Sequence, residues 1–438
     1  MNCTRKSGCD GSLVRRFRPA KPLYLLLLSD YAAQYGNPRS CSHRLSVAGP
    51  TWPPIAQSDR ISESVALIKF IHSSDLHLGK TFGKFPEDVR VRLRQARADA
   101  VTKLAGLARD NAASHILLAG DTFDQTTPAP SVIRQAMNAM RAADHVIWVL
   151  MPGNHDHANA TELWRQVVQD APANVVVLLT PAPHELAKGV VLLPAPPSER
   201  HPGRDLTGWF DEAATGEALR IGLAHGSVTD FDSSEEGGSS IIPVDRARRS
   251  GLAYLGLGDW HGQLSIGAQT WYSGAPESDG FKHAEIPAAL LVEIAAVGAP
   301  AKVTALPTGS IFWQRVQLDL TEDDDVLARH RQVLPPLAQR ALTLFDLQVT
   351  GRAHALARVA LELAATAVAP DFLSHSADFA GVAMVHATDD LDAIDRNGAL
   401  RAAAEALAKD ASDPLQTPEA RATAQAALSH LFSYALEV

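Results

Sequence analysis

The middle of the chain alternates short, continuous apolar runs with longer amphipathic stretches, which predicts strands joined by helices. Two amphipathic stretches have the pattern of helices, one over about 87–110 and one that starts beside Pro130. Continuous apolar runs are typical of strands buried on both faces, and helical crossovers between them imply parallel pairing. The runs are "IKFIH" (68–72), "HILLA" (115–119), "HVIWVLM" (145–151), "VVVLL" (175–179), "VVLLP" (190–194), "RIGLA" (220–224) and "YLGLG" (254–258).

Later apolar runs follow one another through short links, which predicts a second, more antiparallel sheet stacked on the first. These runs are "TWYSG", "AALLVEIAAV", "KVTAL" and "WQRVQLDL". The expected fold class is therefore α/β, with two packed β-sheets flanked by helices. After about residue 311 the order is a strand, a helix (323–335), the strand "LTLFDLQVTG", an alanine-rich helix (354–367) and two final helical stretches. This order predicts a smaller C-terminal α+β accessory domain.

The chain is expected to divide into three segments. Residues 1–66 show no sustained period of 2 or 3.6, so we expect a disordered or wrongly annotated extension. Residues 67–310 form the expected core domain, and residues 311–438 the accessory domain. A chain of 438 residues is long enough for two domains with separate cores.

Composition narrows the class of protein. With 46% hydrophobic and 20% charged residues, the chain is expected to be globular rather than a membrane protein. Its three cysteines all lie at or before Cys41, so the remainder fits a reducing cytoplasm. The formal charge of −9 predicts no generally basic surface, so any contact with nucleic acid must be local or shared with a partner.

Polar residues that can bind metal follow five of the predicted strands, mostly beside a glycine. They are Asp75 and His77, Asp121 and Asp124, Asn154 with His155 and Asp156, His225, and Asp259 with His261. In an open α/β sheet, ligands bind at the carboxyl ends of the strands, so these five ends can converge on one site. One such end is ordinarily a polar turn, but five with the same ligand types indicate a metal centre.

The types of side chain predict which ions bind and what they do. Carboxylates, imidazoles and an amide, without thiolates, suit manganese, iron or zinc. Seven of these ten residues as ligands would be too many for one ion, and would fit two ions that share a bridging carboxylate. Two ions about 3.5–4 Å apart can turn a bridging water into hydroxide and stabilise an in-line displacement at phosphorus. The prediction is a two-metal phosphodiesterase that acts through a metal-bridged hydroxide, most simply with manganese, and with iron, magnesium or zinc as alternatives.

The motifs "DLH", "GDTFD", "GNHD", "AHG" and "GDWH", in this order, resemble those of the calcineurin-like metallophosphoesterases. "FIHSSDLHLGK", "ILLAGDTFD" and "MPGNHD" are similar to the SbcD-like DNA-repair exonuclease subfamily, and the resemblance covers roughly residues 67–310. It implies that Asp75, His77 and His261 hold one metal and that Asp121 bridges to the second. It also implies that Asn154, His225 and Asp259 complete the second site. His155 would then be the catalytic, acid-like group that assists the leaving oxygen or steadies the transition-state phosphate.

Three aspartates need separate interpretation. Asp124 and Asp156 are expected to fix loops or imidazole tautomers, with plain turn capping as the alternative. Asp259 departs from the resembling family, whose last motif is usually Gly-His-x-His. A carboxylate can still bind a metal, so Asp259 stays a predicted ligand with an altered metal preference.

The leading hypothesis is a cytoplasmic SbcD-like nuclease that acts on DNA in repair. The resemblance implies an SMC-like ATPase partner and a C-terminal cap, and a homodimer is compatible with it; no membrane partner is expected. A metal-dependent phosphoesterase for a small nucleotide or another phosphodiester is the alternative, and an inactive partner-binding scaffold is a third. Residues that bind substrate are unassigned. Arg90, Arg94 and Arg97 share a helix face that either touches phosphate or is solvated.

Overall fold

The computed structural model describes residues 68–228, 241–282, 286–385 and 398–437. The predicted extension over 1–66, with the three cysteines, and the acidic segment 232–240 lie outside these residues.

The first sheet has six strands in the order β14-β13-β1-β2-β3-β4. Strands β1 to β4 are parallel, and β13 adds antiparallel to β1 and then pairs with β14. The strands are β1 (Ile68–Ser73), β2 (His115–Ala119), β3 (Ile147–Met151), β4 (Val175–Val177), β13 (Ala288–Ile294) and β14 (Lys302–Pro307).

The second sheet also has six strands, in the order β11-β12-β10-β7-β6-β5. Its four middle strands are parallel, and β5 and β11 are antiparallel at the two edges. The strands are β5 (His184–Ala187), β6 (Val190–Ala195), β7 (Leu219–His225), β10 (Tyr254–Gly258), β11 (Leu264–Ser265) and β12 (Thr270–Tyr272). Short elements beside it are η2 (Gly208–Asp211), the pair β8 (Ser227–Val228) and β9 (Ile241–Ile242), and α4 (Arg246–Arg249).

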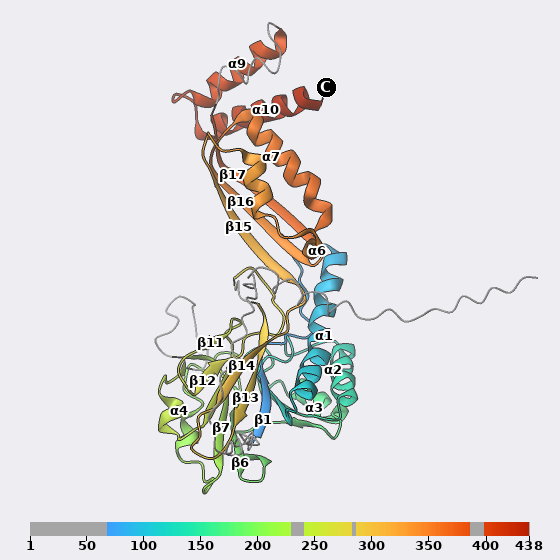
Figure 1. The fold of residues 1–438 in the computed structure, drawn as a ribbon, viewed down its shortest axis with the longest axis vertical. Coiled ribbons are helices and arrows are strands. Elements are labelled where there is room, and N and C mark those ends of the chain that lie inside the picture. Colours follow the sequence, from blue (N-terminus) through green and yellow to red (C-terminus); the bar gives the residue numbers. More distant parts are fainter. Residues whose placement is uncertain (1–67, 229–240, 283–285, 386–397, 438) are drawn as a thin grey trace, which may run out of the picture. The chain divides into compact units, whose positions relative to one another are not determined.

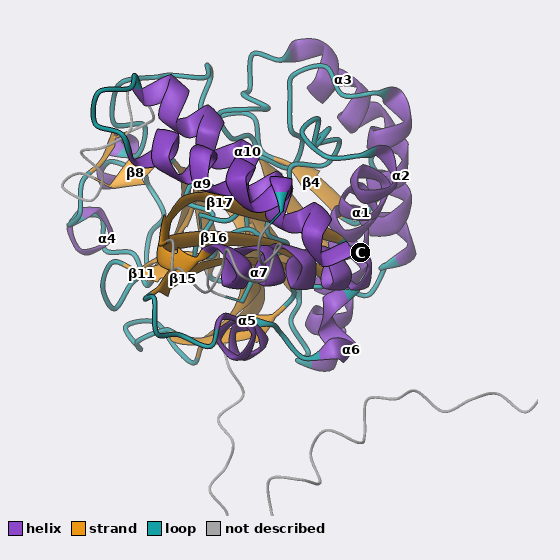
Figure 2. Ribbon diagram, turned by 90° about the horizontal axis from the view of Figure 1, so that it is seen from above, coloured by secondary structure: helices purple, strands orange, loops and turns teal. Residues whose placement is uncertain are grey.

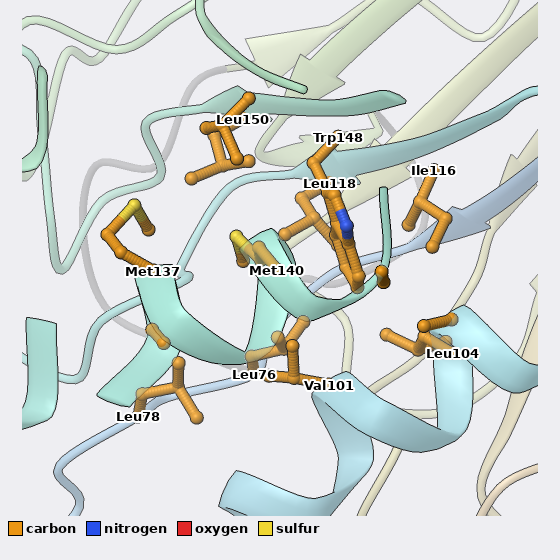
Figure 3. Close-up of a cluster of buried hydrophobic side chains, with 14 of the residues drawn as sticks. Leu76, Leu78, Val101, Leu104, Ile116, Leu118, Met137, Met140, Trp148 and Leu150 are labelled. Atoms are coloured by element: carbon orange, nitrogen blue, oxygen red, sulfur yellow. The ribbon is translucent and has the colours of Figure 1, made fainter. Parts of the chain in front are cut away.

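The central strands of the first sheet are buried on both faces, which explains their continuous apolar runs, whereas the edge strand β14 is largely exposed. One face packs under the helices α1 (Glu87–Asp110), α2 (Pro130–Ala142) and α3 (Thr161–Asp170) (Figure 1). Leu104 of α1 and Met140 of α2 meet Trp148 of the sheet in this layer (Figure 3). The other face packs on the second sheet, where Phe70 meets Tyr254 with ring centroids 5.6 Å apart.

The two packed sheets flanked by helices were expected, but the assignment of strands to sheets differs from the prediction. "AALLVEI" and "KVTAL" return to the first sheet as β13 and β14, and the second sheet is built on the parallel strands β6, β7 and β10. An apolar run indicates that a strand is buried, but it does not indicate which strand pairs with it in the sheet. The order of the runs along the chain was therefore a poor guide to pairing.

The C-terminal region contains a three-stranded parallel sheet in the order β15-β16-β17. The helices α5 and α7 lie beside this sheet (Figure 2). Val326 of α5 and Leu361 of α7 belong to the same buried cluster as Phe345 and Leu347 of β16. β17 was not predicted, because its small and polar residues leave it mostly half-buried or exposed and give no apolar run. The elements are β15 (Phe312–Leu320), α5 (Val326–Val333), α6 (Leu337–Arg340), β16 (Thr343–His354), α7 (Ala355–Val368), η3 (Ala369–Asp371), β17 (Ser374–Val385), α9 (Ala399–Ser412) and α10 (Pro418–Glu437).

The domain boundary near residue 311 stays a prediction, although β15 starts at Phe312. Within the described ranges, no helix combines the length and apolar character needed to cross a membrane.

Candidate metal centre

The ends of five strands, drawn from both sheets, meet at the edge of the core. Strands β1, β2 and β3 of the first sheet and β7 and β10 of the second end beside one another. Glycine is required where they touch, because a Cβ on Gly120 would overlap the His225 ring and one on Gly258 would overlap the Ala119 carbonyl oxygen. The glycines beside the predicted ligands therefore allow the two sheets to approach each other.

Four of the predicted ligands have a backbone conformation that side chains rarely adopt. Asp75, His77, Asp121 and Asp259 have φ of 55°, 44°, 53° and 99°. Non-glycine residues with positive φ are uncommon, and they concentrate at functional sites where the surrounding structure enforces them. These left-handed residues turn the chain sharply at the strand ends and bring their side chains into one space.

The ligands predicted for the first metal lie together. Asp75, His77 and His261 each offer an atom within 4.8 Å of the others. The Nε2 atoms of His77 and His261 are 3.2 Å apart, and His261 Nε2 lies 3.8 Å from Asp75 Oδ1. Two imidazole nitrogens and a carboxylate that face one small space have the composition of a cation site.

Asp121 lies between this group and the ligands predicted for the second metal. Its Oδ2 is 3.5 Å from His77 Nε2 and 3.7 Å from His225 Nε2. His225 Nε2 is also 3.7 Å from Asp259 Oδ1, and Asn154 Nδ2 donates to that oxygen at 3.3 Å. The structure thus brings all seven predicted ligands together, with Asp121 where a bridging carboxylate must lie. Their roles as ligands stay predictions.

Each histidine of the site presents its Nδ1 to an oxygen atom. His225 Nδ1 donates to the Ala119 carbonyl at 2.8 Å, and His155 Nδ1 donates to the Asp124 carbonyl at 2.9 Å. His77 Nδ1 lies 3.2 Å from Asp124 Oδ1, and His261 Nδ1 lies 3.1 Å from Asp279 Oδ1. For His225, His155 and His261, an oxygen partner at Nδ1 leaves Nε2 with the lone pair that binds a metal, whereas His77 Nδ1 makes no hydrogen bond with the described residues.

The residues present fit divalent cations. Among the described residues, His225 Nε2 and Asn154 Oδ1 are buried and have no hydrogen-bond partner. Both residues contact the Asp259 carboxylate, and a bound cation would give these two atoms the partner that buried polar atoms ordinarily have. Both atoms belong to the predicted second site, and both are atoms that bind divalent cations.

Burial and crowded charges perturb the titratable groups. Burial raises the pKa of Asp121 well above its usual value, and burial also lowers the pKa of His77. Burial opposes the charged form of His225 too, but the carboxylates of Asp121, Asp75 and Asp259 outweigh it and raise the pKa of His225 to about 9. Without cations the cluster therefore retains protons, which bound divalent ions would displace.

His155 and the two supporting aspartates lie in the same loops. The His155 amide donates to Asp121 Oδ1 at 2.9 Å, and its ring centroid lies 4.8 Å from that of His77. Asp156 accepts from the amides of Gly153 at 2.6 Å and Phe123 at 3.0 Å, so it joins two of the ligand loops. Asp124 faces His77 with its carboxylate and His155 with its carbonyl. The catalytic role of His155 stays a prediction.

Arg90, Arg94 and Arg97 on α1 were predicted to touch phosphate or to be solvated, and for Arg97 this prediction was wrong. Its side chain is 2% exposed, and its Nη1 donates to the carbonyls of Leu76 at 2.6 Å and Asp75 at 3.3 Å. Arg90 and Arg94 instead pair with Glu87 on the exposed face. The i, i+4, i+7 spacing identified one side of the helix but could not show that its last member turns under the loop of Asp75.

Sequence reasoning also missed two acids in the loop after β12. Asp279 contacts His261, and the 2% exposed Glu277 accepts from the amides of Ser310 and Ile311 at 2.9 Å each. The letters "ESDG" after the strand "TWY" were the available signal. They were overlooked because this strand end is separate from the five motifs.

Comparisons with known proteins find similarity to metallophosphoesterases. A family model described as calcineurin-like phosphoesterase matches residues 68–249, which include every predicted ligand except Asp259 and His261. The chain is 24% identical over 284 residues to the uncharacterized metallophosphoesterase YhaO of Bacillus subtilis (strain 168), an alignment of 61% of this chain and 66% of that protein. It is 24% identical over 291 residues to one subunit of the nuclease SbcCD from the same organism, with 57% and 70% covered.

The alignments thus span about two thirds of each curated relative. Among solved structures, the protein TT1561 of Thermus thermophilus aligns with a TM-score of 0.37 and 12% identity, over 55% of this chain and 99% of that one.

Proposed function

Residues 68–249 match the family model of the calcineurin-like phosphoesterases, and from this premise we propose that the protein is a two-metal phosphodiesterase that hydrolyses DNA. The observation that carries the proposal is the convergence of seven ligand-type residues from five strand ends, with buried His225 Nε2 and Asn154 Oδ1 left without partners among the described residues. DNA as the substrate is supported by the similarity to a subunit of the nuclease SbcCD.

The chain's own residues have distinct tasks in this mechanism. Asp75, His77 and His261 would hold one ion, Asn154, His225 and Asp259 the other, and Asp121 both. Two bound divalent ions supply an activated water and neutralise the charge of the phosphate. The carbonyl of Asp124 can only accept a hydrogen bond, so His155 carries a proton on Nδ1. A second proton on Nε2 would make the ring an acid that gives this proton to the leaving oxygen and returns to the neutral form.

A small nucleotide or another phosphodiester is the second candidate substrate. The formal charge of −9 favours it, because a long polyanion is repelled by an acidic protein unless cations are concentrated locally. The name of the second relative marks that protein as one subunit of a nuclease. We propose by analogy that this chain works with a partner protein, an SMC-like ATPase.

The test compares two substrates under identical conditions. The full chain is freed of metal, given manganese, and assayed on linear duplex DNA and on bis(p-nitrophenyl) phosphate, with Asp121→Asn as the matched control. Hydrolysis of DNA that EDTA and Asp121→Asn both abolish supports the proposal. Hydrolysis of the aryl diester without hydrolysis of DNA would contradict DNA as the substrate and favour a small phosphodiester. If neither substrate is hydrolysed, with or without manganese, the result would contradict the proposal that the protein is an enzyme and favour a binding scaffold.

A further inference from the structure

The loop between β12 and β13 carries an acidic residue directly behind one predicted metal ligand. Asp279 Oδ1 lies 3.1 Å from His261 Nδ1, and the Asp279 side chain is only 14% exposed. On the far side of the ring, His261 Nε2 faces His77 Nε2 at 3.2 Å and Asp75 Oδ1 at 3.8 Å. The imidazole therefore lies between a carboxylate and the predicted first metal site.

Two cations hold this carboxylate in its ionised form. Lys80 Nζ lies 2.6 Å and Arg97 Nη2 lies 3.5 Å from Asp279 Oδ2, the oxygen that does not face the imidazole. An ionised carboxylate can only accept hydrogen bonds, so its neighbour on His261 must be a protonated Nδ1. A neutral imidazole with its hydrogen on Nδ1 has its lone pair on Nε2, the atom that faces the metal site.

We propose that Asp279 is a positioning residue that fixes the tautomer and the orientation of His261 for metal binding. This role rests on the proposed two-metal function and extends it to a residue outside the five strand-end motifs. The carboxylate also makes the imidazole a stronger electron donor, because it stabilises the partial positive charge that develops on a metal-bound ring. Loss of such an outer partner typically weakens metal affinity about 10–100-fold.

Glu277 provides a matched control from the same loop. Its carboxylate accepts from the Ser310 amide and hydroxyl and from the Ile311 amide, at 2.8 to 3.0 Å. It therefore fixes the loop to the segment before β15, while Asp279 contacts the ligand. A variant at Glu277 tests whether any change in the loop is enough to weaken the site.

The first test measures manganese binding to the metal-free full chain by titration calorimetry. Asp279→Ala should weaken one of the two ions about 10–100-fold and leave the other close to wild type. Asp279→Asn keeps a hydrogen-bond acceptor but loses the charge, so its affinity for that ion should lie between those of the wild type and Asp279→Ala. Glu277→Gln should bind both ions like wild type. Wild-type affinity in Asp279→Ala and Asp279→Asn, or an equal loss in Glu277→Gln, would overturn the proposal.

A second readout needs neither metal nor activity. With ¹⁵N-labelled histidine, the His261 ring of the metal-free wild type, observed at alkaline pH where the ring is neutral, should show the hydrogen on Nδ1. Asp279→Asn, whose folding is checked by its thermal unfolding, should show a mixture of tautomers, whereas an unchanged spectrum would refute the positioning role. A wild type that binds two manganese ions but hydrolyses no phosphodiester would contradict the proposed function and leave this role of Asp279 standing.

Discussion

Replacing Arg97 with methionine should destabilise the loop that carries Asp75, the first predicted ligand. The guanidinium is 2% exposed and donates to three backbone carbonyls, those of Leu76 at 2.6 Å, Asp75 at 3.3 Å and Glu277 at 3.4 Å. Its Nη2 also lies 3.5 Å from Asp279 Oδ2. Methionine fills much of the same volume but satisfies none of these oxygens.

The magnitude follows from the groups that are left behind. Removing one partner of a buried ion pair costs about 3–5 kcal/mol, and a buried acceptor without a partner costs about 1–3 kcal/mol. These costs overlap, and Lys80 still pairs with Asp279, so we expect the free energy of unfolding to fall by about 3–5 kcal/mol. Arg97→Lys keeps the charge but cannot reach several oxygens at once, so it should lose less.

The assay is urea unfolding of the metal-free full chain, followed by fluorescence and circular dichroism. Arg94→Met is the matched control, because Arg94 lies on the same helix but pairs with Glu87 in solvent. It should change the stability little, since exposed ion pairs contribute little. If Arg97→Met unfolds at the same urea concentration as Arg94→Met, the buried guanidinium does not support the ligand loop.

Three further predictions concern the metal centre itself. His155→Ala should keep both ions but lose about 10²–10⁴ in kcat; loss of one equivalent of bound manganese would show His155 to be a ligand. Asp259→Ala should weaken binding of the second ion, while Asp259→His should support hydrolysis and tolerate zinc better, because imidazole is a softer ligand. The measurement is the metal content and the rate of each variant with manganese, magnesium and zinc. Wild-type metal content and rate in Asp259→Ala would show that Asp259 is a turn residue and not a ligand. The folded pKa of His225 is raised to about 9, above its unfolded value, so its stabilising effect on the metal-free chain is fully present below about pH 6.5 and is lost as the pH rises through about 9. Urea unfolding in EDTA between pH 6 and pH 9 should show this loss of stability, and the loss should be smaller in His225→Gln. An equal change of the free energy of unfolding with pH in both proteins would contradict the assignment of the effect to His225.

Much of the core could be predicted because its signals are local. The helix expected over about 87–110 is α1 (Glu87–Asp110), and the run "HILLA" is β2 (His115–Ala119). The site could be predicted for the same reason, since each predicted ligand lies at the end of a strand or within a few residues after it, and the carboxyl ends of parallel strands share an edge. What local patterns predict well is therefore the elements and the residues at their ends.

The features that could not be predicted from the sequence depend on contacts between distant segments. The pairing of β13 with β1 joins residues more than 200 positions apart, and no feature of "AALLVEI" specifies that partner. Arg97 and Asp279 are separated by 182 positions and meet only once the two sheets have packed. Arg97 on an otherwise polar helix face and "ESDG" in a loop have the ordinary appearance of solvated charges, so only the fold reveals that they support the ligands.

The central claim is that Asp121 bridges two ions that carry out phosphodiester hydrolysis. The most direct measurement is the manganese stoichiometry of the full chain and of Asp121→Ala, taken together with kcat on the substrate that the wild type cleaves. The account predicts two equivalents in the wild type, loss of bound metal in Asp121→Ala, a kcat lower by several orders of magnitude, and no hydrolysis in EDTA. Two tightly bound ions and substantial turnover in Asp121→Ala, or turnover by the wild type in EDTA, would contradict it.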